Sequence, residues 1–185
     1  MDLSILDEGY LQQFEDYKKH FPIGIYGPFS NPHLQMLKSL KTALVDEKYN
    51  ARISLDIGES DPQREEENRD DYNGRMSDRL VNESMIHILL LFVEGEGEHS
   101  VNESALFELS ALFERKRNDS ILILGEKTVE MNAFLQRRGI FWSRRRMFNY
   151  SQLTNFESVE DVVEVSASFC YVSILRYYKT LGYNE

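Results

Sequence analysis

A β-α-β pattern between residues 83 and 127 constrains the fold more than any other feature of this chain. Residues 85–93 form an unbroken apolar run, Met-Ile-His-Ile-Leu-Leu-Leu-Phe-Val, which is typical of a strand buried on both faces of a sheet. A polar loop follows, and residues 101–113 then place apolar side chains on one stripe at helical spacing. Residues 120–125 are a second apolar strand. The pattern predicts a parallel sheet with helices on both faces.

The alternation of strands and helices extends over the remainder of the chain. Three further strands are predicted at residues 22–27, 51–57 and 144–150. Further helices are predicted at residues 4–20, 32–50, 73–81, 128–139 and 158–181. Five strands that alternate with helices predict a three-layer αβα fold, with a parallel five-stranded sheet in the flavodoxin-like or Rossmann-like order 2-1-3-4-5.

One domain is predicted over residues 1–185. Residues 1–21 supply an added N-terminal helix, residues 22–150 form the α/β core, and residues 151–185 supply a C-terminal helix that completes the core. The most polar stretch, residues 58–72, has no apolar periodicity. We interpret it as a solvated surface loop, with a mobile lid as the alternative.

Composition and charge exclude several classes of protein. The net charge of −10 disfavours nonspecific binding to nucleic acid or to anionic membranes. We interpret the basic cluster Arg137–Arg146 as neutralising the acidic surface or as a homodimer contact, with phosphate or RNA binding as the alternative. The single cysteine, Cys170, allows no disulfide within the chain, and no apolar run reaches the length of a membrane span. The N-terminus lacks the features of a signal peptide, so the sequence predicts a cytoplasmic protein.

The predicted strand order places a ligand crevice between the first and third strands. The residues expected to line it, from the ends of three strands and the helix after the third, are Tyr26, Gly27, Pro28, Phe29, Asp56, Gly95, Asn102, Ser104 and Glu108. Glu108 is the candidate catalytic group, because carboxylates near such crevices do chemistry. Its alternative role is a solvated helix residue or a salt bridge to Arg115.

The other candidates suggest a polar ligand with a flat ring. Asp56, at the expected tip of the second strand, suits a ribose hydroxyl, although a turn cap is its alternative role. Phe29 or Tyr26 suits stacking on a base. Asn102 and Ser104 offer hydrogen-bond donors near a helix N-terminus. The four histidines and one cysteine have no metal-ligand spacing, so no metal or other cofactor is predicted, and His87 is expected to be a packed core residue.

Two motifs of the sequence resemble a known superfamily. The first is Ile-Tyr-Gly-Pro-Phe at residues 25–29, and the second is Ser-Val-Asn-Glu-Ser-Ala-Leu-Phe-Glu-Leu-Ser-Ala-Leu at residues 100–112. They are similar to the small-Gly-Pro turn and to the Asp-x-Gly-Thr-x-x-Glu helix of the nucleoside 2-deoxyribosyltransferase-like superfamily. Asn102 stands at the place of the Asp, Ser104 at that of the Gly, and Glu108 at that of the catalytic Glu. A more distant similarity is to Toll/interleukin-receptor (TIR) type domains that cleave NAD.

The resemblance implies an enzyme that cleaves or transfers at an N-glycosidic bond, a hydrolase or a transferase. Glu108 would be the nucleophile or would stabilise an oxocarbenium-like centre, and the ligand would be a nucleoside, a nucleotide or NAD. One alternative is a noncatalytic nucleotide-binding or TIR-like signalling module. Another is an interaction domain built on the first and last helices.

Overall fold

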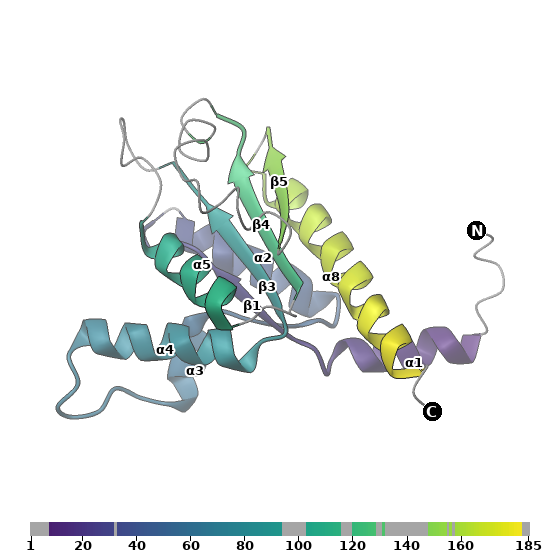
Figure 1. The fold of residues 1–185 in the computed structure, drawn as a ribbon, viewed down its shortest axis with the longest axis horizontal. Coiled ribbons are helices and arrows are strands. Elements are labelled where there is room, and N and C mark those ends of the chain that lie inside the picture. The colour runs from purple at the N-terminus through teal and green to yellow at the C-terminus, as the bar shows by residue number, and fades with distance from the viewer. Residues whose placement is uncertain are drawn as a thin grey trace.

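The computed structural model describes residues 8–31, 33–93, 103–115, 120–128, 131, 148–154, 156 and 158–182. Side chains are described from residue 12 in the first helix, from residue 108 in the helix that follows the third strand, and up to residue 180 in the last helix. The sheet has five strands, all parallel, in the order β2-β1-β3-β4-β5 (Figure 1). In this order the strands are Asn50–Arg52, Pro22–Tyr26, Ile86–Leu91, Ser120–Glu126 and Asn149–Leu153. The predicted three-layer α/β architecture and its strand order are confirmed.

Strand β3 is the centre of the sheet. All six of its residues are buried, as the unbroken apolar run predicts. Ile86, Ile88 and Leu90 point into the core on one face of the sheet. Leu89 and Leu91 point into the core on the other. The two cores therefore share this strand.

Helices cover both faces of the sheet. On one face α2 and α8 pack against each other and on the strands. On the other face α4 and α5 do the same, and α3 packs against α4 (Figure 1). Helix α1 lies against α8, where Phe14 makes an edge-to-face contact with Tyr171. The helices in chain order are α1 (Glu8–Lys18), α2 (His33–Asp46), α3 (Ser54–Ser60), α4 (Arg69–Glu83), α5 (Glu103–Arg115) and α8 (Val159–Gly182).

The second predicted strand is wrong in its length. Strand β2 ends at Arg52, and the residues after Ile53 form helix α3 rather than more strand. The side chain of Asp56 explains the change, because its Oδ2 accepts a hydrogen bond from the backbone N–H of Ile53 at 2.8 Å. This bond caps the first turn of α3. Asp56 also pairs with Lys41, so it is a helix cap and an ion-pair partner, not the tip of a strand.

The last strand is displaced from its prediction. Strand β5 covers residues 149–153, whereas the prediction was 144–150, of which residues 144–147 lie outside the described part of the chain. The strand is hydrogen-bonded on one side to Leu122–Glu126 of β4 and is only partly buried. A half-buried strand at the end of the order accepts polar residues such as Ser151 and Gln152, which an apolar pattern misses.

Helix α4 begins earlier than predicted, because Asn68 caps it. The Asn68 Oδ1 accepts hydrogen bonds from the backbone N–H groups of Asp70 and Asp71, at 3.0 and 2.9 Å. These bonds satisfy donors that the first turn of a helix leaves unpaired. The irregular polar segment therefore shortens to residues 61–68.

Arg75 fastens the 61–68 segment to α4. Its guanidinium donates to both carboxylate oxygens of Glu67, at 2.7 and 2.8 Å, and to Asp61 at 2.5 Å. Chiefly because Arg75 donates to it, the pKa of Glu67 falls to about 2. Arg79 donates to Asp61 as well, at 2.8 Å. The interpretation as a solvated surface segment fits, while these bonds oppose a mobile lid.

Two further expectations concern buried groups. His87 is fully buried, and its Nδ1 lies 2.9 Å from the Tyr26 hydroxyl, so it is the packed core residue that was expected. Cys170 is a free, buried thiol whose pKa is raised by burial. Among the helices that the structure describes, none has both the length and the apolar character that a membrane crossing requires.

Removing the Arg75 guanidinium should open the 61–68 segment. We expect Arg75→Gln to increase the rate of cleavage by a glutamate-specific protease at residues 65–67 several-fold, because Glu67 and Asp61 lose their main partner. Arg176→Gln, an exposed change on α8, is the matched control. Equal cleavage rates in the two variants and the wild type would show that the ion pairs do not hold the segment.

Candidate functional site

A cavity of about 530 Å³ opens at the carboxyl ends of β1 and β2. It lies on the face of the sheet that α4 and α5 cover. Helix α3 packs against α4 on this side of the molecule (Figure 1). Ligands bind at this edge in open parallel sheets. The volume is within the range of roughly 300–1,000 Å³ that small-molecule sites occupy. The lining residues are Gly27, Phe29, Leu34, Ser54, Leu55, Arg69, Asn73, Gly74, Ser77 and Glu108.

Glu108 has an unusual environment in this cavity. Its Oε1 accepts a long hydrogen bond, 3.4 Å, from the Ser77 hydroxyl of α4. Its Oε2 is buried and has no hydrogen-bond partner among the described residues. Although the residue as a whole is partly exposed, Oε2 is withdrawn from water. Burial raises the pKa of Glu108 to about 8, and the hydrogen bond from Ser77 opposes this shift. The carboxyl group of the free protein is therefore mostly protonated at pH 7.

The cavity brings together three of the predicted site residues. Gly27, Phe29 and Glu108 come from two separate segments of the chain and line the same space. Phe29 is 41% exposed and Leu55 is 44% exposed, so two large apolar side chains stand at the cavity in contact with solvent. At Gly27 an added Cβ would lie 3.0 Å from the Leu37 side chain, so this glycine is needed for close packing.

Other predicted residues near the first two strands do not line this cavity. Tyr26 is 1% exposed, and its ring points into the core toward His87, away from any position where it could stack on a base. Pro28 is buried as well. The Asp56 carboxylate is occupied by Lys41 and by the backbone of Ile53.

The remaining predicted site residues lie on the loop and helix after β3. Gly95 and Asn102, like His99, are outside the described part of the chain. Ser104 lies in the first turn of α5, and its side chain is also outside the described part. Their predicted contacts with a ligand stay predictions.

The sequence reasoning missed the polar residues that α4 contributes. Arg69, Asn73 and Ser77 are spaced four residues apart, so they fall on one side of the helix, and all three line the cavity. The i, i+4, i+8 spacing was visible in the sequence. It was overlooked because the helix was expected to begin only at residue 73.

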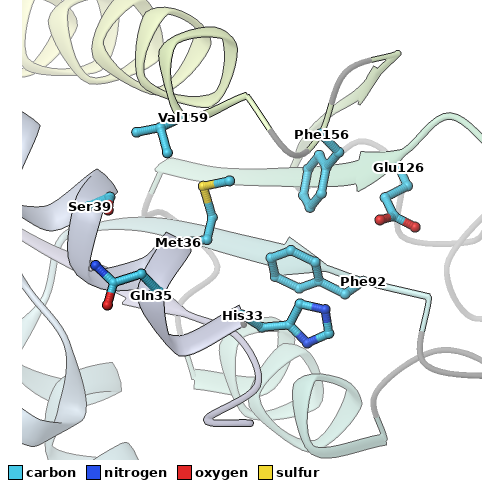
Figure 2. A pocket seen from close by; sticks show the side chains of 8 residues that line it. All are labelled: His33, Gln35, Met36, Ser39, Phe92, Glu126, Phe156 and Val159. Carbon is cyan, nitrogen blue, oxygen red and sulfur yellow. The ribbon is translucent and has the colours of Figure 1, made fainter. Parts of the chain in front are cut away.

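A second cavity, of about 420 Å³, lies on the opposite face of the sheet, between α2 and the start of α8 (Figure 2). The ring of Phe92 lies between the rings of His33 and Phe156. It stacks on His33 with the ring centroids 4.1 Å apart, and it makes an edge-to-face contact with Phe156 with the ring centroids 4.9 Å apart. Glu126 is the acidic residue of its lining, and one of its oxygens accepts the backbone N–H of Val93 at 3.3 Å. No carboxyl oxygen among the described residues that line this cavity is buried and unpaired, so the Glu108 cavity is the candidate active site.

Comparisons with known proteins find no match. None of the models of known protein families, none of the curated proteins and none of the solved structures that were searched matches this chain. Within the described ranges there is no group of three or more His, Cys, Asp or Glu residues placed to hold a metal ion.

The raised pKa of Glu108 has a consequence for stability. The unfolded chain releases the Glu108 proton near pH 4.5, but the folded protein holds it until about pH 8. The wild type should therefore lose stability relative to Glu108→Gln as the pH rises from about 4.5 to about 8, by roughly 1–3 kcal/mol in the free energy of unfolding. Urea denaturation at several pH values measures the difference. Glu114→Gln, an exposed change on the same helix, should change in stability with pH as the wild type does. If the free energies of unfolding of the wild type and of Glu108→Gln change in parallel with pH, the Glu108 carboxyl group is not buried as described.

Proposed function

We propose that the Glu108 cavity binds a nucleoside, a nucleotide or NAD, and that Glu108 attacks the anomeric carbon to cleave or transfer the base. The observation that carries the proposal is the buried Oε2 of Glu108, which has no partner among the described residues inside a cavity of small-molecule size. A carboxyl group left unpaired in this way costs stability, and such costs collect at functional sites. The resemblance of residues 25–29 and 100–112 to the deoxyribosyltransferase-like superfamily supplies the reaction class.

The proposed reaction has two displacement steps. A Glu108 carboxylate oxygen bonds to the anomeric carbon while the carbon–nitrogen bond breaks and the electron pair leaves with the base. The base of a nucleoside or nucleotide takes up a proton from solvent, whereas nicotinamide leaves NAD as a neutral molecule without one. Water, which gives up a proton to solvent, or a second base then displaces the carboxylate from the same carbon and regenerates Glu108. Positive charge that develops on the sugar favours the ionised form of Glu108.

The apolar side chains at the cavity suit the base. Phe29 and Leu55 are two of the exposed large hydrophobic residues of the structure, and both line this cavity. A flat base that covers them would remove their surface from water. The polar groups Ser54 and Asn73 are available for the sugar.

Glu108→Gln should abolish base release. The amide keeps the size of the side chain but is a poor nucleophile, so we expect a loss of turnover by a factor on the order of 10³ or more. The assay incubates the protein with NAD, nucleosides and nucleoside monophosphates and measures the free base by chromatography. Glu114→Gln is the matched control and should keep wild-type activity. Base release that survives Glu108→Gln would remove Glu108 from the mechanism.

The pH dependence of turnover tests the role of Glu108 separately. A nucleophile must be ionised, and the pKa of Glu108 is about 8. We therefore expect kcat/KM for base release to rise about tenfold per pH unit below pH 8 and to level off above it. A rate that falls above pH 8 would instead make Glu108 a proton donor to the leaving base.

The second candidate function is a nucleotide-binding or signalling module without turnover. The observation that favours it is the buried Oε2 of Glu108, which has no partner among the described residues and which a bound ligand could engage through a hydrogen bond without any reaction. Burial raises the pKa of Glu108 to about 8, and a protonated carboxyl group can donate such a bond. This function predicts nucleotide binding with no released base, and binding that survives Glu108→Gln.

A further inference from the structure

One face of α4 connects Glu108 with a cationic group farther along the same cavity. Ser77 contacts Glu108, and Asn73 and Arg69 follow at successive turns toward the start of the helix. From Ser77 to Arg69 the helix rises about 12 Å, a distance that the long arginine side chain can partly span. Beside them, no atom lies within 4 Å of the place where a Cβ would stand at Gly74, so the cavity stays open there.

Arg69 differs from the other arginines of α4 and α5. Arg75 and Arg79 each bind acidic side chains around Asp61, and Arg115 binds Asp78 at 2.9 Å. The Arg69 side chain has neither an ion pair nor a hydrogen bond within the part of the chain that the structure describes. Arg69 is exposed and lines the cavity, so an anionic group of a ligand in the cavity can reach its guanidinium without displacing an acidic side chain among the described residues.

The neighbours of Arg69 do not fill this role. Asp70 and Asp71 follow it directly, and successive helix residues point about 100° apart, so they do not share its face. Asp71 is engaged by the Asn68 side-chain amide at 2.6 Å. The nearest lining residue along the helix is Asn73, whose neutral amide can donate to the same anion.

We propose that the ligand of this cavity carries a phosphate on its sugar, and that Arg69 binds that phosphate while the glycosidic carbon lies at Glu108. The guanidinium fork matches two phosphate oxygens, and the single positive charge of Arg69 among the lining residues offsets one phosphate charge. This inference rests on the proposed function and narrows it: nucleotides, not nucleosides, are the substrate class. Arg69 determines specificity and takes no part in bond breaking.

The test compares matched pairs, such as adenosine with its 5′-monophosphate and guanosine with its 5′-monophosphate. Binding to the full chain is measured by calorimetry at fixed salt. We expect each monophosphate to bind at least about tenfold more tightly than its nucleoside, and Arg69→Gln to remove that difference within each pair. Arg69→Lys keeps the charge and should retain part of the preference. Arg176→Gln, an exposed change on α8, is the control and should leave it intact.

The outcomes separate this inference from the proposed function. Equal affinity for both members of each pair, or a preference that survives Arg69→Gln, would overturn the phosphate assignment even if base is released. A preference that depends on Arg69 without any base release would uphold the assignment and leave the glycosidic reaction without support. Inorganic phosphate that binds as tightly as the monophosphates would overturn a nucleotide as the ligand. Absence of binding by every compound would overturn both proposals.

Discussion

The burial of strand β3 is the constraint on which the rest of this structure depends. Its six residues are withdrawn from water on both faces, and it pairs with β1 on one side and β4 on the other. A strand of this kind is stable only if helices cover both faces of the sheet, so a core must form on each face. The helices of these cores also surround the carboxyl ends of the strands. The Glu108 cavity lies at the carboxyl ends of β1 and β2, where α4 and α5 cover the sheet.

Within this framework Glu108 is an acidic side chain whose burial is only partly compensated. The cores consist almost entirely of aliphatic and aromatic side chains, and the polar pair of Tyr26 and His87 inside one of them is hydrogen-bonded. Among the described residues, the carboxyl group of Glu108 has one long hydrogen bond, from Ser77, and its Oε2 has none. A buried polar group without its full set of partners weakens the fold, so its presence calls for a reason other than stability. The proposed chemistry on a bound ligand would supply such a reason.

The sequence predicted those parts of the fold that depend on apolar periodicity. The alternation of apolar strands and helices, centred on the run at residues 85–93, predicts the strand order that the structure has. The same pattern places Glu108 on the helix after β3, where it lines a cavity. The predicted element boundaries are wrong where local hydrogen bonds from side chains to the backbone determine the backbone conformation. Asp56 converts an apparent strand into helix α3 by capping Ile53, and Asn68 starts α4 before any apolar residue appears. Such caps depend on which neighbour is within reach, which the spacing of residues does not reveal.

Fold rules about where strand ends meet account for part of the candidate site. They led to Gly27, Phe29 and Glu108, which the structure brings together in one cavity, while their contact with a ligand stays a prediction. Tyr26, expected to stack on a base, instead turns its ring to the core from its position in β1. The α4 residues were missed because their helix was expected to begin too late.

The ion pairs around Arg75 have a further consequence for recognition. They tie the segment before α4 to the helix in the absence of any ligand, through bonds to Glu67 and Asp61. The side of the cavity formed by α4 is therefore ordered in the folded protein, and the proposed ligand would not have to order that backbone. The conformational entropy of that segment is lost when the chain folds, so its loss would not reduce the affinity for the ligand. In this way a cluster of charges outside the described lining of the cavity would preorganise the proposed binding surface.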